Sequence, residues 1–111
     1  MATVAAYAEL IKRVLREHAQ IKPSYENIAV EVICDDAQGH YEIMYAGWVG
    51  DRRVHGSALH IDLRDGKIWI QHDGTERGVA AELLEAGVPP TDLVLAFHAP
   101  DDRKHTLFAV G

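Results

Sequence analysis

The sequence predicts an α+β domain in which helices pack on one face of an antiparallel four-stranded meander. An amphipathic segment opens the chain, four stretches rich in β-branched and aromatic residues follow across short turns, and a second amphipathic segment comes after them. The short turns indicate antiparallel neighbours, because a parallel crossover needs about a dozen residues or more. Two short strands are expected after the second helix.

The first helix is predicted from a single apolar stripe. Thr3 is its expected N-cap, because the hydroxyl can accept a hydrogen bond from an unpaired backbone N–H. Pro23 is expected to stop the helix from continuing. The residues at the i, i+3, i+4, i+7 spacing of one helix face are Val4, Tyr7, Ala8, Ile11, Val14, Leu15 and His18.

Four strands are expected next, each bounded by turn residues. Asp65-Gly66 is the strongest hairpin signal, since a type I′ turn requires positive φ at both central positions. Residues 36–39 and 50–53 are the other expected turns. The predicted strands are Ile28–Asp35, Tyr41–Val49, Val54–Arg64 and Lys67–Asp73.

Strict alternation of side chains predicts which residues share a face of this meander. Counting from Asp65-Gly66 places Leu63 opposite Ile68, Ile61 opposite Ile70, Leu59 opposite His72, Asp62 opposite Trp69 and His60 opposite Gln71. Counting through a four-residue turn at 50–53 places Met44 beside Leu59, Trp48 beside His55, Tyr45 beside Ala58 and Ile43 beside His60. The face away from the helices is then unexpectedly apolar, which indicates a homodimer or ligand surface. Its expected apolar members are Tyr41, Ile43, Tyr45 and Trp69, next to His60 and Asp62.

The second helix is predicted over about Glu76–Ala86, with Thr75 as its cap. Gly87 suits the left-handed position after a helix, and Pro89-Pro90 end the element. Its apolar stripe comprises Val79, Ala80, Leu83 and Leu84. The two final strands are expected over Leu93–Phe97 and Thr106–Val110.

Length and charge limit the class of protein. The 111 residues fit one domain, residues 1–111, and a net charge of −6 excludes a DNA grip that relies on a basic surface as a whole. The single cysteine, Cys34, excludes an internal disulfide and a four-cysteine zinc site, and it is expected as a small buried residue. The chain shows no secretory signal and no apolar run of membrane-spanning length, so we expect a cytoplasmic protein.

No catalytic constellation is predicted. Alternation places His60 and Asp62 on one face but His55 and His72 on the other, so no metal site and no cofactor are expected. His60 and Asp62 are interpreted as a hydrogen-bonded pair in a protein interface, with a proton-transfer pair as the alternative. Asp65-Gly66-Lys67 matches one end of a metal-dependent nuclease motif, but a tight turn explains it better.

Several runs of the sequence are distinctive. They are His60-Ile61-Asp62, 65–71 (Asp-Gly-Lys-Ile-Trp-Ile-Gln), 73–76 (Asp-Gly-Thr-Glu), 85–89 (Glu-Ala-Gly-Val-Pro), Phe97-His98 and Phe108-Ala109-Val110. Together they resemble the XisI family, the fdxN-element excision controlling factors of cyanobacteria. Gly47-Trp48 and the N-terminal helix also fit. The resemblance covers essentially the whole chain. It implies an accessory protein that acts in DNA recombination beside a recombinase and a nuclease-like factor, XisH.

The leading hypothesis is therefore a non-enzymatic regulator that binds a protein partner such as an XisH-like factor. Direct DNA binding within a recombination complex is the alternative, and a nuclease component using Asp62 and His60 is a third hypothesis. Arginine and tryptophan are favoured as interface anchors. The expected partner-binding residues are Trp48, Arg52, Arg53, His55, His60, Asp62, Trp69 and Arg103.

Overall fold

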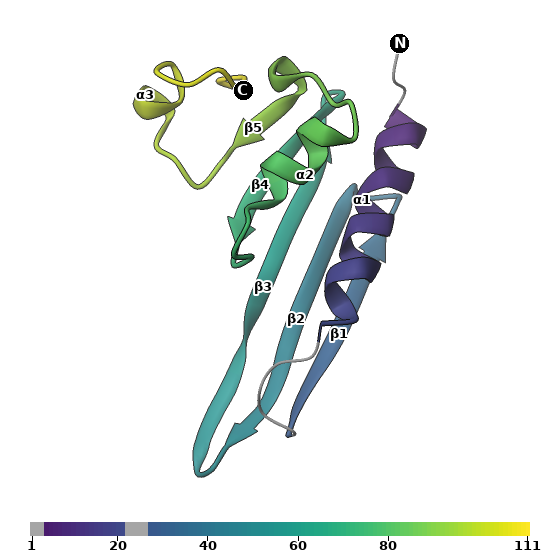
Figure 1. Ribbon diagram of the computed structural model, residues 1–111, viewed down its shortest axis with the longest axis vertical. Coiled ribbons are helices and arrows are strands. Elements are labelled where there is room, and N and C mark those ends of the chain that lie inside the picture. The colour runs from purple at the N-terminus through teal and green to yellow at the C-terminus, as the bar shows by residue number, and fades with distance from the viewer. Residues whose placement is uncertain (1–3, 22–26) are drawn as a thin grey trace.

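The computed structural model describes residues 4–21 and 27–111. A five-stranded sheet with strand order β1-β2-β3-β4-β5 forms its body, and α1 and α2 lie side by side on one face of it (Figure 1). In chain order the elements are α1 (Val4–Ala19), β1 (Ile28–Asp35), β2 (His40–Val49), β3 (Arg52–Arg64), β4 (Lys67–Asp73), α2 (Val79–Glu85), the 3₁₀ helix η1 (Pro90–Asp92), β5 (Leu93–Leu95) and α3 (Pro100–Arg103). The predicted α+β class, with helices on one face of the sheet, is confirmed.

The apolar stripe of α1 packs on the sheet as predicted. Its buried residues are Tyr7, Ala8, Ile11, Val14 and Leu15. The expected cap Thr3 and the expected stop Pro23 lie outside the described residues. Within residues 4–21 and 27–111, none of the helices is long and apolar enough to cross a membrane.

Strands β1 to β4 form the predicted antiparallel meander, and β5 adds a parallel strand beside β4. The predicted strand over 106–110 is wrong, since only Ala109 bridges to Val94. Backbone amides in this segment are used locally: the Thr106 N–H donates to the Arg103 carbonyl and the Phe108 N–H to the Thr106 hydroxyl. The strand predicted over Leu93–Phe97 ends at Leu95.

Helix α2 begins at Val79, three residues later than predicted, and Thr75 is not its cap. The Asp73 carboxylate accepts the Val79 N–H at 2.7 Å and the Thr75 N–H at 2.9 Å, so the residues between β4 and α2 form a loop around this side chain. Gly78 has a φ of 90°, which interrupts any helix through it. Gly87, with a φ of 100°, ends the helix in the left-handed conformation as predicted.

The pairing predicted for the hairpin at Asp65-Gly66 is confirmed near the turn but is wrong farther along the strands. Both turn residues have positive φ, and Asp62 lies opposite Trp69 as predicted. Beyond Ile61, however, β4 contains one extra residue, so His60 lies opposite His72. The predicted pairs His60–Gln71 and Leu59–His72 are therefore wrong by one residue.

The hairpin between β2 and β3 differs more from the prediction. Its loop is the two residues Gly50-Asp51, so Trp48 lies opposite Arg53 rather than His55. A β-bulge follows, because β2 has no partner residue for Ala58, whose carbonyl instead accepts the Gly74 N–H at 2.8 Å. The structure has Met44 opposite Ser57, Tyr45 opposite Gly56, Ile43 opposite Leu59 and Glu42 opposite His60. These pairs replace the four predicted for this hairpin.

The corrected register changes the composition of both sheet faces. Tyr41 and Ile43 are 1% and 3% exposed and belong to the core beneath the helices. Trp69 pairs with Asp62 on the opposite face. The apolar face predicted from Tyr41, Ile43, Tyr45 and Trp69 therefore does not exist, and the homodimer expected through it loses its basis.

Candidate functional site

One face of the sheet is turned away from α1 and α2 (Figure 1), and the strand register places most of the predicted site residues on it. We call it the open face. The bulge at Ala58 shapes it, because odd-numbered residues of β3 point to this face before the bulge and even-numbered residues after it. From β2 and β3 the open face takes His40, Glu42, Met44, Trp48, Arg53, His55, Ser57, His60, Asp62 and Arg64. Strand β4 adds Trp69 and Gln71.

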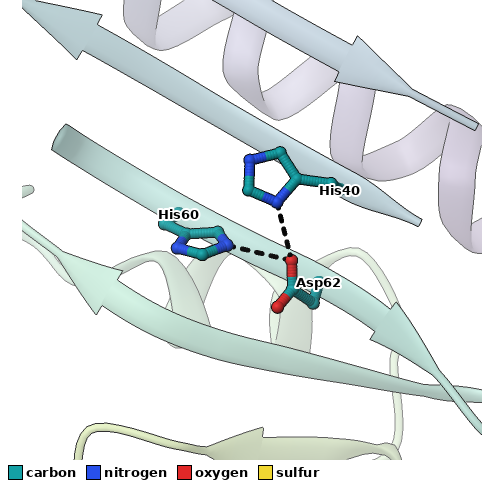
Figure 2. Close-up of side chains that lie close together, drawn as sticks. All are labelled: His40, His60 and Asp62. Atoms are coloured by element: carbon teal, nitrogen blue, oxygen red, sulfur yellow. Dashed lines mark hydrogen bonds and ion pairs between the residues drawn. The ribbon is translucent and has the colours of Figure 1, made fainter. Parts of the chain in front are cut away.

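A histidine–aspartate–histidine cluster occupies the middle of the open face (Figure 2). Asp62 Oδ1 lies 2.9 Å from His60 Nε2 and 3.2 Å from His40 Nδ1. The two imidazole rings tilt against each other with centroids 4.5 Å apart. His60 and Asp62 share β3, whereas His40 begins β2, so the cluster joins two strands.

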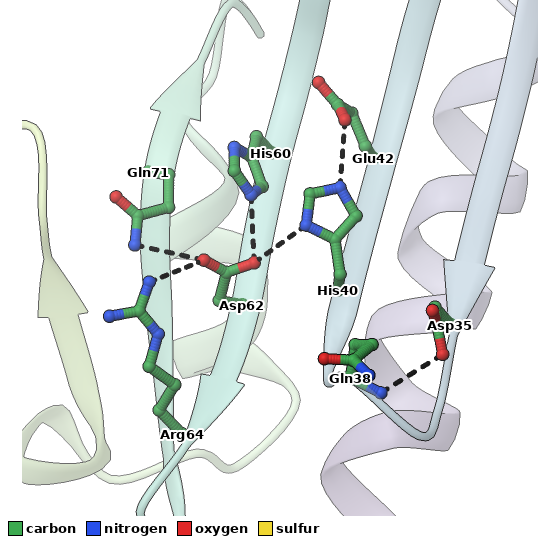
Figure 3. Close-up of polar contacts among 8 residues, drawn as sticks. All are labelled: Asp35, Gln38, His40, Glu42, His60, Asp62, Arg64 and Gln71. Atoms are coloured by element: carbon green, nitrogen blue, oxygen red, sulfur yellow. Dashed lines mark hydrogen bonds and ion pairs between the residues drawn. The ribbon is translucent and has the colours of Figure 1, made fainter.

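Three further polar side chains, those of Glu42, Arg64 and Gln71, contact this cluster (Figure 3). Arg64 Nη2 and Gln71 Nε2 donate to the other carboxylate oxygen, Asp62 Oδ2, at 3.0 and 3.2 Å. Glu42 Oε2 lies 3.0 Å from His40 Nε2. Asp62 is the hub, because its carboxylate contacts side chains from three strands while its residue is only 8% exposed.

The surroundings favour the charged form of both carboxylates. Burial raises the pKa of Asp62, but the hydrogen bonds from His60 and Arg64 and their positive charge lower it by more, so the net shift is downward. Burial likewise raises the pKa of Glu42, and the hydrogen bond with His40 together with the neighbouring histidine charge turns the net shift downward. The cluster thus concentrates negative charge beside two histidines.

The distal end of the β2–β3 hairpin holds four of the predicted residues, three of them on the open face. The Arg53 guanidinium lies 5.5 Å from the Trp48 ring centroid, in cation–π range. Both side chains are exposed, as are Arg52 and His55. The structure therefore brings these residues together on the β2–β3 hairpin, at the opposite end from Trp69.

The remaining two predicted residues meet at the proximal end. Arg103 and Arg64 both lie over the Trp69 ring, at 5.8 and 5.4 Å. Arg103 also donates to the carbonyls of Ala96, His98 and Val110. These hydrogen bonds connect residues within the C-terminal segment, and the contact with Trp69 connects that segment to the sheet.

Sequence reasoning missed His40, Glu42 and Gln71 as members of the site. A two-residue turn at Gly50-Asp51 alone would place His40 opposite Ile61, and only the bulge at Ala58 brings it opposite Asp62. Cys34 is exposed and not buried as expected, because β1 is an edge strand whose outer half is open. Partial desolvation of its sulfur by neighbouring atoms nevertheless raises the pKa of the Cys34 thiol.

The fold and the site together define a small α+β protein with helices on one sheet face and a polar, histidine-bearing surface on the other. The chain belongs to the XisI family, whose family model, described as XisI protein, matches residues 1–110. This confirms the resemblance found in the sequence.

Two crystal structures from Anabaena variabilis share this fold. One, described as a XisI-like protein, is 38% identical, covers 97% of this chain and 99% of its own, and superposes with a TM-score of 0.93. The other, the fdxN element excision controlling factor XisI, is 31% identical, covers 97% and 98%, and has a TM-score of 0.86. No curated protein matches the sequence.

Proposed function

We propose that this chain is a non-enzymatic regulatory protein that controls excision of a DNA element by binding a protein partner through its open face. The partner that the family resemblance suggests is an XisH-like factor. The similarity to a protein named as an excision controlling factor, over 97% of the chain, supports the regulatory role. The main observation that supports the open face as the binding surface is that Trp48, Arg53 and Asp62 share it and that α1 and α2 leave it uncovered (Figure 1).

The distal end of the open face suits a protein contact. Trp48 is exposed and held under the Arg53 guanidinium, and exposed tryptophan and arginine side chains are the usual anchors of protein interfaces. The cluster around Asp62 supplies fixed polar groups beside these anchors. The net charge of −6 disfavours DNA as the main ligand of the surface.

Co-expression with an XisH-like protein, followed by tagged co-purification and light scattering, tests this proposal. We expect a stoichiometric complex, and the variant Trp48→Ala/Arg53→Ala should weaken it at least about tenfold. Arg16→Ala is the control, since Arg16 is an exposed arginine on the helix side. Equal loss in the control, or no loss in the double variant, would place the contact elsewhere.

Failure to form any complex would direct the next experiment to DNA. A gel-shift assay over a range of salt concentrations then applies, because phosphate contacts weaken steeply as salt rises. A salt-dependent shift by this chain alone would overturn the protein-partner proposal in favour of direct DNA binding.

A further inference from the structure

We propose that His40, His60 and Asp62 form a binding site for a divalent transition-metal ion, with Zn²⁺ as the best match. This inference goes beyond the regulatory role and does not depend on it. Two imidazole nitrogens and one carboxylate oxygen are a donor set that zinc accepts, with its fourth position left to water or to a group from a bound partner.

The distances already suit a metal. His40 Nδ1, His60 Nε2 and Asp62 Oδ1 all lie within 4.8 Å of one another. Ligand atoms about 2.0–2.1 Å from a tetrahedral zinc ion lie about 3.3 Å apart. The present separations from Asp62 Oδ1, 2.9 and 3.2 Å, are close to that value, so an ion requires only small side-chain movements.

Outer partners orient two of the three donors, as they do in metal sites. Glu42 lies 3.0 Å from His40 Nε2, so this nitrogen donates its proton to Glu42 and Nδ1 is left with a free lone pair. Arg64 and Gln71 occupy Asp62 Oδ2, which leaves Oδ1 as the atom directed at the histidines. His40 and Asp62 thus each have a further side chain that fixes the direction of the donor atom.

Charge and access also favour a cation. Glu42 and Asp62 carry two negative charges, and Arg64 carries one positive charge. A bound cation would therefore neutralise the remaining negative charge. The side chains of His40 and His60 are 36% and 26% exposed, which gives an ion a path from solvent. All three ligands stand on paired strands rather than on a loop, so the site is rigid before the ion arrives.

The test is titration of the chelator-stripped full chain with ZnCl₂ by calorimetry, in a Cys34→Ser background to remove the exposed thiol. We expect one ion per chain, and a loss of affinity of at least about 100-fold in His60→Gln. Glu42→Gln should cost about 10–100-fold, the usual effect of an outer partner. His55→Gln is the matched control, because His55 is an exposed histidine on the same strand and face.

A second measurement needs no variant. Histidine side-chain ¹⁵N shifts of the wild-type chain should show His40 binding zinc through Nδ1 and His60 through Nε2. The proposal is overturned if the stripped chain takes up no zinc, if His55→Gln loses as much affinity as His60→Gln, or if these two nitrogens do not shift. In each of these cases the cluster is a hydrogen-bonded network only.

Discussion

Asp62 offers the sharpest test of how the open face is held together. Replacing it with Asn keeps the shape but removes the charge, and an amide cannot accept at both ends. If its oxygen faces His40 and His60, its NH₂ group meets the donors of Arg64 and Gln71. Hydrogen bonds to a charged group contribute about 1.5–3 kcal/mol each when buried. The partners here are partly exposed and regain water, so we expect a total loss of about 2–3 kcal/mol.

Urea denaturation at pH 7 in EDTA, followed by circular dichroism, measures this loss without any metal contribution. The transition midpoint should fall while the slope stays constant, as for a change in stability alone. Asp51→Asn, an exposed position in the β2–β3 turn, should change stability by less than about 0.5 kcal/mol. A value for Asp62→Asn as small as that of the control would refute the role of Asp62 as hub.

Three further outcomes follow from the structure. Burial, with a hydrogen bond to Asp36, raises the pKa of Tyr41 to about 12, so the folded state holds this proton more tightly and stability should fall as pH rises above about 10. Tyr41→Phe should flatten that alkaline decline, and parallel denaturation curves between pH 8 and 11 would contradict it. Asp73→Ala removes the acceptor of the Val79 N–H and should cost about 1–2 kcal/mol, with faster exchange of that amide; unchanged exchange would argue against the cap. Gly47→Ala would place Cβ 1.9 Å from a backbone oxygen, so it should destabilise by about 3 kcal/mol or more in thermal melts, whereas Gly56→Ala, with open space at Cβ, should not.

Local patterns predicted the elements well because each depends on its own residues. The stripe of α1 and the turn at Asp65-Gly66 are set by spacing and by backbone conformation within a few residues. The start of α2 was predicted too early because its cap, Asp73, is six residues from the N–H that it accepts. Ordinary capping rules consider only the residue beside the helix.

The composition of the site was less predictable because it depends on register. The prediction assumed unbroken alternation along β3, so it separated His55 from His60 and never placed His40 beside Asp62. At the bulge, the Ala58 carbonyl accepts a hydrogen bond from the N–H of Gly74, which lies 16 positions further along the chain. A hydrogen bond between such distant residues leaves no periodic trace in the sequence.

The unpaired residue Ala58 in β3 also bears on how this surface can change over evolutionary time. Deleting Ala58 would restore even pairing, because Ser57 opposite Met44 and Leu59 opposite Ile43 would become consecutive pairs, and both ends of the open face would keep their side of the sheet. A one-residue gap at this position in a related sequence would therefore signal loss of the bulge with the same residues on the open face. Substitutions on either side of the bulge, by contrast, let the aromatic–arginine end and the histidine cluster diverge independently.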